Sequence, residues 1–211
     1  MNLLPIDELN ALRTKVESIL IDLQIGVKTK KQAKKEICDD LLELLLIAYT
    51  YGCEDVNEML GTQIAPTYDE MRESIYRKIA GEDFEQRVGQ YIQEFSDAME
   101  YADEHATTAP GEEIPKVPTP PLSDIMRIAD TDSHRVYNEA GYTTAKQGGA
   151  TTKKWVCHFH NSRDTHIYLH DTEVPIDAEF YTFLGNHAMF PGEFGVAYED
   201  VHCECTVEYR K

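Results

Sequence analysis

The spacing of apolar residues divides the chain into two unlike parts. In the first part, apolar residues recur at three- and four-residue steps, which is typical of one face of an amphipathic helix. This pattern predicts helices over residues 5–24, 29–51 and 55–60, with Gly52 ending the second of them. The first helix carries its apolar stripe at Leu9, Leu12, Val16, Ile19, Leu20 and Leu23.

Two further helices are predicted before residue 105. Thr67 and Glu70 have the spacing of a capping box, so a helix is expected to begin there. A break at Gly81 separates it from a helix whose stripe is Phe84, Val88, Ile92 and Phe95. We therefore predict that residues 1–105 form a helical arm that contacts partners.

Residues 106–122 mark the expected domain boundary, because five Pro and one Gly cannot continue a helix. Ser123 is suited to cap the next helix, predicted over residues 123–147 and ended by Gly148. Asp132 and His134 interrupt the apolar steps of that helix. They either face a neighbouring element or form a solvated face, and the pattern leaves both open.

The last part of the chain, residues 153–211, changes to short alternating segments separated by Gly and Pro. Residues 153–158 and 201–209 alternate as strands do. The fold class predicted from the whole chain is therefore α+β. It comprises a helical arm, a long helix after a Pro-rich linker, and a small β-rich module, with residues 123–211 as the second domain.

Charge and composition narrow the function. The formal net charge is -18, from 38 acidic and 20 basic residues, so weak or no direct nucleic-acid binding is expected. Pro5, Asp7 and Glu8 interrupt any signal peptide, and the longest apolar run, residues 41–48, is too short to span a membrane. Five cysteines without an export signal favour reduced thiols or metal ligands over disulfides.

Cysteine and histidine concentrate in the terminal module. On a regular strand, Cys203 and Cys205 point the same way about 7 Å apart, so a shared metal requires a bend there. Cys157 and His166 are the natural third and fourth ligands, with His160 or His202 as substitutes, and zinc suits such a set. The alternative places the cysteines in the packed face, with Arg163 and His166 bonded to turn carbonyls.

Several motifs of this region follow one another in an ordered series. The helix carries Arg135 and Asn138, and Trp155, Arg163 and His166 come next. Val174-Pro175-Ile176-Asp177, Pro191-Gly192 and Cys203-Glu204-Cys205 complete the series. The order resembles that of the tailed-phage head morphogenesis family (Mu F-like minor head proteins), over roughly residues 70–211. The sequence departs from that family at His160, His202 and Glu204.

The resemblance implies a non-enzymatic minor head protein that acts in head assembly at the portal vertex and in genome delivery. It also implies phage portal protein and other head proteins as partners, a possible homo-oligomer, and a location in the virion and, during assembly, the host cytoplasm. The alternative from a different class is a zinc-dependent nuclease or toxin-like domain that uses the C-terminal His and Cys residues.

Overall fold

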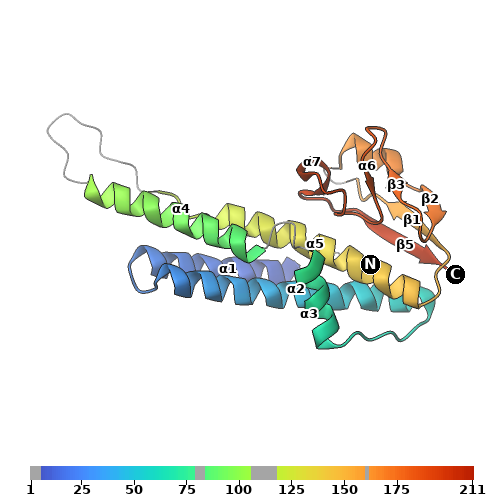
Figure 1. Ribbon diagram of the computed structural model, residues 1–211, viewed down its shortest axis with the longest axis horizontal. Helices are drawn as coiled ribbons and strands as arrows, with labels where there is room; N and C mark the ends of the chain where they lie inside the picture. Colours follow the sequence, from blue (N-terminus) through green and yellow to red (C-terminus); the bar gives the residue numbers. More distant parts are fainter. Residues whose placement is uncertain (1–5, 79–83, 106–117, 160–161) are drawn as a thin grey trace.

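The computed structural model describes residues 6–78, 84–105, 118–159 and 162–211, and it has the expected α+β fold. Two long helices, α2 (Lys30–Leu60) and α5 (Leu122–Gln147), lie side by side through most of the molecule. The β-rich module sits on α5 near the end where the C-terminus lies (Figure 1).

The remaining long helices complete an aliphatic core around this pair. Helices α1 (Ile6–Gln24) and α4 (Phe84–Glu104) pack on α2, and the short α3 (Tyr68–Lys78) crosses it. The predicted stripe of α4 is buried as expected. So is the stripe of α1 from Leu12 onward, whereas Leu9 is partly buried. Thr67 and Glu70 form the predicted capping box, with Thr67 N donating to Glu70 Oε2 over 2.8 Å.

Gly52 does not end a helix, so the prediction of two helices over 29–51 and 55–60 was wrong. Helix α2 continues through Gly52 and ends at Gly61, whose φ of +64° suits a helix C-cap. A Cβ at position 52 would lie 2.2 Å from the backbone oxygen of Tyr137. Glycine is present because α5 approaches α2 closely at that point.

The expected cap at Ser123 was also wrong. Helix α5 begins one residue earlier, at Leu122, with Pro121 at the cap position, and Ile125 N donates to Pro121 O. The break at Gly81 and residues 106–117 of the predicted linker lie outside the described residues. The division of the chain at 106–122 stays a prediction. Within the described structure, α5 shares the aliphatic core of α1, α2 and α4.

The module is built on a three-stranded antiparallel sheet of order β2-β1-β5. Strand β1 (Thr152–Val156) pairs with both β2 (Glu173–Pro175) and β5 (Thr206–Arg210). A two-residue pair, β3 (Phe180–Tyr181) and β4 (His187–Ala188), lies beside it, together with the short helices α6 (Asp164–Leu169) and α7 (Ala197–Asp200). Across the described ranges, no helix is long and apolar enough to cross a membrane.

Residues 201–209 do not form one strand as expected, because β5 begins only at Thr206. The preceding residues turn instead, and His202 has a φ of +54°. This turn is the bend that a shared metal at Cys203 and Cys205 was predicted to require.

Candidate metal centre

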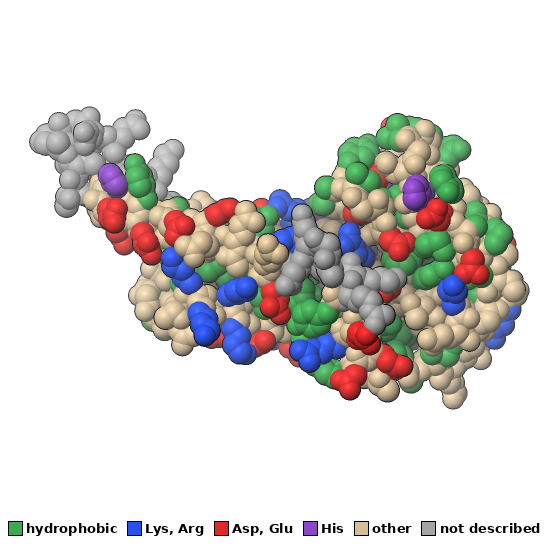
Figure 2. Space-filling model, in the orientation of Figure 1, with side chains coloured by type: hydrophobic (Ala, Val, Ile, Leu, Met, Phe, Trp, Pro, Cys, Tyr) green, Lys and Arg blue, Asp and Glu red, His purple; other side chains and the backbone are tan. Residues whose placement is uncertain are grey.

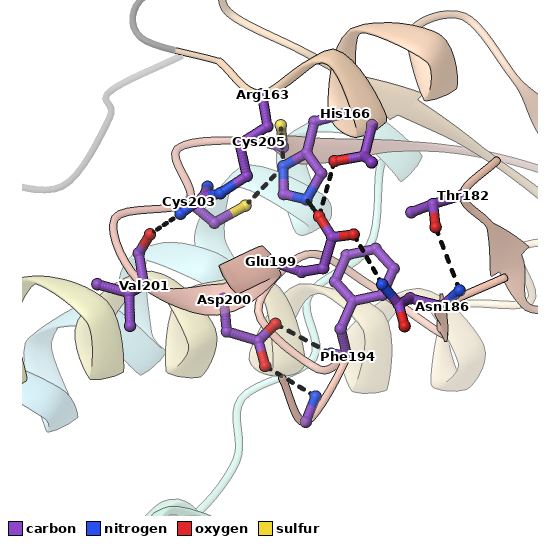
Figure 3. A network of polar contacts seen from close by, with 12 residues as sticks. Arg163, His166, Thr182, Asn186, Phe194, Glu199, Asp200, Val201, Cys203 and Cys205 are labelled. Atoms are coloured by element: carbon purple, nitrogen blue, oxygen red, sulfur yellow. Dashed lines mark hydrogen bonds and ion pairs between the residues drawn. The ribbon is translucent and has the colours of Figure 1, made fainter. Parts of the chain in front are cut away.

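The module holds a buried group of three possible metal ligands, His166, Cys203 and Cys205 (Figure 3). The Nδ1 atom of His166 lies 3.5 Å from Cys203 Sγ and 3.6 Å from Cys205 Sγ. All three donor atoms lie within 4.8 Å of one another, and each residue is at most 3% exposed. One imidazole nitrogen thus faces two sulfurs inside the protein.

Contacts from two helices hold the cysteines in place. Asn138 of α5 donates from Nδ2 to the backbone oxygen of Cys205 over 3.1 Å. Arg163, directly before α6, donates to the backbone oxygen of Val201, and Cys203 N donates to Asp200 O over 3.2 Å. The turn that brings the two sulfurs together is therefore fixed by side chains outside it.

A fully buried carboxylate lies behind the imidazole. Glu199 of α7 is 0% exposed, and its Oε2 lies 3.1 Å from His166 Nε2, without the in-line geometry of a full hydrogen bond. Thr165 donates to Oε2 over 2.7 Å, and Asn186 donates to Oε1 over 2.9 Å. A carboxylate on the far nitrogen of a ligating histidine orients the ring and raises its basicity.

Aromatic rings close the site. Trp155 meets the His166 ring edge-on, with centroids 5.5 Å apart, and Phe194 stacks on it at 5.4 Å. The indole nitrogen of Trp155 is buried and makes no hydrogen bond within the described structure. The group is thereby kept from water, which strengthens every charge interaction within it.

The two thiols titrate as a pair. The hydrogen bond from Cys205 holds the pKa of Cys203 well below its usual value, and the His166 ring acts in the same direction. The same bond raises the pKa of Cys205, and burial adds to that rise. One sulfur therefore ionises far more readily than the other, and a bound cation would favour the thiolate form of both.

This set of donors could hold a metal ion, as the Cys-x-Cys and His pattern predicted. Two sulfurs and one imidazole suit soft or borderline cations. Cys157 is also buried, but its sulfur is not part of the group of atoms within 4.8 Å. His202 pairs instead with Asp130 of α5 at 2.7 Å, and His160 lies outside the described residues.

The other predicted motif residues mostly join the module to α5. Arg135 donates from Nε to Gly192 O over 2.5 Å, and a Cβ at Gly192 would lie 3.2 Å from Arg135 Cα. Pro191 beside it is buried. Asp177 also contacts α5, but at the surface, where its exposed carboxylate pairs with Lys146 at 2.6 Å.

Sequence reasoning missed Glu199 and the residues that hold it. Glu199 stands four residues before Cys203, within an acidic Tyr-Glu-Asp run that resembles a solvated turn. The sequence offered one signal for it, the hydroxyl of Thr165 beside the predicted ligand His166. A hydroxyl in that position can hold a carboxylate that contacts the imidazole. Asn186 comes from a distant turn that the pattern does not connect to the site.

A cleft of about 550 Å³ is lined in part by Ala197 and Asp200 of α7, the helix whose Glu199 lies beside His166. It is bounded by α4, α5 and the segment that includes α7. Arg87 and Arg135 line it, and both are paired, Arg87 with Asp132 and Arg135 with Asp200 at 3.6 Å. Glu139 and Glu193 also line it, so carboxylates outnumber guanidinium groups there.

Comparison with known proteins gives one informative similarity. The chain is 43% identical over 86 residues to the NAD(+)–arginine ADP-ribosyltransferase EFV of Enterococcus faecalis. The matching segment is therefore part of an enzyme. The match covers 38% of this chain and 18% of the relative, so the chain spans less than a fifth of the relative's length. No family model matches the chain, and no solved structure matches it.

These findings correct the main functional expectation. The resemblance to phage head morphogenesis proteins is overturned, because the match is to an ADP-ribosyltransferase and no family model supports the phage family. The expectation of a non-enzymatic capsid protein falls with it, since the relative is an enzyme. The toxin-like alternative agrees better with this relative. The expected partners, homo-oligomer and location stay predictions.

Proposed function

We propose that this chain takes part in NAD+-dependent ADP-ribosylation of arginine. The observation that carries the proposal is the 43% identity over 86 residues to an enzyme named for that activity. The shared stretch is 18% of that enzyme, so its activity comes to this chain only through the proposal.

The chemistry of the cleft beside α7 supports a role in this reaction. ADP-ribosylation breaks the bond between nicotinamide and ribose and develops positive charge on the sugar, which carboxylates stabilise. Glu139 and Glu193 supply carboxylates, and the surplus of negative charge attracts a cationic arginine acceptor. Arg87 and Arg135 supply the planar donors that suit a diphosphate. The cleft volume is within the range of sites for molecules of this size.

We further propose that zinc is the metal of the His166–Cys203–Cys205 group and that it stabilises the fold. Structural zinc sites are closed, whereas catalytic ones keep a position open to water or substrate. The burial of all three residues and of Glu199 favours the closed kind. It argues against a metal-dependent nuclease at this group, since such an enzyme must admit its substrate. Zinc there would fix α7, which also lines the cleft.

The test uses the purified chain, NAD+ labelled in its adenylate part, and agmatine as a small guanidine acceptor. Labelled agmatine and an equal amount of free nicotinamide are expected. Glu193→Gln should lower the rate roughly 100-fold, because it removes a charge from the cleft. Glu94→Gln on the exposed face of α4 is the matched control and should leave the rate unchanged. If the wild-type chain forms no labelled agmatine and releases no nicotinamide, the proposal is overturned.

A further inference from the structure

Cys157 follows the last residue of β1, and Cys205 precedes the first residue of β5. Strands β1 and β5 pair antiparallel, with Trp155 opposite Val207 and Val156 opposite Thr206. Cys157 and Cys205 are the residues next to this last pair, just outside the ladder. Because Val156 and Thr206 are paired, the chain brings a third cysteine near the metal group.

Cys157 also lies in the core of the module. It belongs to the same buried cluster as Trp155, whose ring covers His166. Cys157 is 2% exposed, and its backbone nitrogen donates to His170 Nδ1 over 3.1 Å. The thiol is therefore buried, and the backbone that carries it is anchored.

We propose that Cys157 is the fourth ligand of a closed Cys₃His zinc site, joining His166, Cys203 and Cys205 when the metal binds. A change of side-chain rotamer moves a cysteine sulfur by about 3 Å, without backbone movement. The zinc would then tie the end of β1, helix α6 and the turn before β5 together at one point. The inference rests on the proposed zinc and is independent of the proposed ADP-ribosylation.

Two other groups compete for the fourth position, and the geometry disfavours both. Glu199 is behind the imidazole, on its Nε2 side, whereas the sulfurs lie on the Nδ1 side (Figure 3). Its two oxygens are already held by Thr165 and Asn186. A water would need an opening, and the rings of Trp155 and Phe194 cover the group.

The unpaired indole of Trp155 fits the same arrangement. Its N–H is buried and makes no hydrogen bond within the described structure. Thiolates that ligate zinc accept hydrogen bonds from outer-shell donors. In the zinc-bound site Trp155 would be such a donor, with Glu199 as the outer-shell acceptor.

The first test counts sulfur ligands on the intact wild-type chain. Zinc X-ray absorption should show three sulfurs and one nitrogen per metal, and the cobalt-substituted protein should show the thiolate charge-transfer intensity of three sulfurs. Two sulfurs with one nitrogen and one oxygen would overturn the proposal. A chain that binds no zinc at all would overturn the metal assignment itself, which is a different result.

The second test uses variants of buried cysteines. Cys157→Ser should weaken zinc binding by more than the roughly 10–100-fold that loss of an outer-shell partner costs, and remove one third of the cobalt charge-transfer intensity. Cys53→Ser, on α2 and bonded to Thr144, is the matched control and should change neither. Glu199→Gln should weaken binding within the 10–100-fold range and leave the intensity intact. Wild-type affinity and intensity in Cys157→Ser would refute the fourth ligand. The wild-type sulfur count decides the question if that variant does not fold.

Discussion

The helical half and the terminal module are held together by different means. The core of the helices is aliphatic, with Leu, Ile and Val from α1, α2, α4 and α5. The core of the module is smaller and combines aromatic rings with three cysteines, and buried polar groups such as Lys153, His166 and Glu199 lie beside it. Burial of apolar area stabilises the first without directional contacts. The second depends on specific partners, so the loss of one of them should matter more there.

Exposed ion pairs occur in both halves, but the module also holds one that is fully buried. Most ion pairs of the helical half are exposed, such as those of Lys15 and Lys35, and exposed pairs contribute little. On the face drawn in Figure 2, basic side chains gather over α1 and α2, away from the module, with acidic side chains among them. In the module, the pair of His166 and Glu199 is at most 1% exposed. The acidic surface thus has little to do with what holds the module together.

Metal removal should have the largest effect and should affect the module alone. At free zinc 1,000-fold above its Kd, binding adds about 4 kcal/mol to stability, which a chelator removes. The single Trp, Trp155, reports on the module by fluorescence, and far-ultraviolet circular dichroism reports mainly on the helices. The Trp155 transition should move to lower temperature on chelation, and the helical transition should stay. If both transitions move to lower temperature together, the two halves unfold as one unit, and the proposed difference in how they are stabilised is wrong.

The buried lysine of the module should make stability depend on pH. Lys153 is 0% exposed, donates to Met189 O over 2.7 Å and lies over the rings of Tyr142 and Phe180. Burial lowers its pKa to about 8 from an ordinary value of 10.5. Between these values the unfolded chain keeps a proton that the folded chain releases, so stability should rise with pH, by at most about 3 kcal/mol.

Urea unfolding of the module, followed by Trp155 fluorescence from pH 7.5 to 10.5, measures this effect. Lys153→Met should flatten the rise. The control Lys154→Met removes a neighbour that pairs with Glu208 near the surface, and the rise should survive in it. A wild-type chain without the rise would show that Lys153 keeps its ordinary pKa when folded.

In the helical half, close packing at Gly52 should be the most sensitive feature. Gly52→Ala places a methyl group 2.2 Å from Tyr137 O, so α2 and α5 must separate. The cost expected for overpacking is about 1–3 kcal/mol, despite the better helix propensity of Ala. The control Gly89→Ala meets only the flexible end of Lys34 at 3.2 Å and should be neutral or stabilising. Equal urea midpoints for the two variants would contradict the role assigned to Gly52.

The smallest of these effects should come from a helix cap. Thr29 caps α2 in a capping box with Gln32, and Thr29→Ala should cost about 1 kcal/mol. Thr14→Ala, in the middle of α1, is the control and should cost less, because Thr14 bonds only to a helix carbonyl. Chemical denaturation followed by circular dichroism measures both. A larger loss of stability in Thr14→Ala than in Thr29→Ala would mean that the cap of α2 does not contribute the stability assigned to it.

The two halves also differ in how well their sequences predict them. Periodic stripes such as Phe84, Val88 and Ile92 predicted helices correctly, because helix packing is local and repetitive. Gly52 was misinterpreted because its role depends on Tyr137, 85 positions away in the chain. A glycine that ends a helix and a glycine that lets two helices pack closely cannot be told apart in a single sequence.

Only part of the metal group was predicted, because some of its residues also depend on contacts between distant segments. His166, Cys203 and Cys205 were proposed from residue type, and the structure brings them together. Glu199 was missed because its burial depends on Thr165 and Asn186, which reach it from other elements. His202 bonds to Asp130 because the turn at φ +54° directs it to α5. Side-chain direction after a turn does not follow from strand alternation.

The side chain of Asn138 offers a way to observe the metal group from outside it. Its Nδ2 donates both to His134 O within α5 and to Cys205 O in the module. A shift of Cys205 on metal binding would change the hydrogen bonding of that amide directly. The resonance of the Asn138 side-chain amide should therefore act as a spectroscopic reporter of occupancy, readable during a zinc titration without altering a ligand.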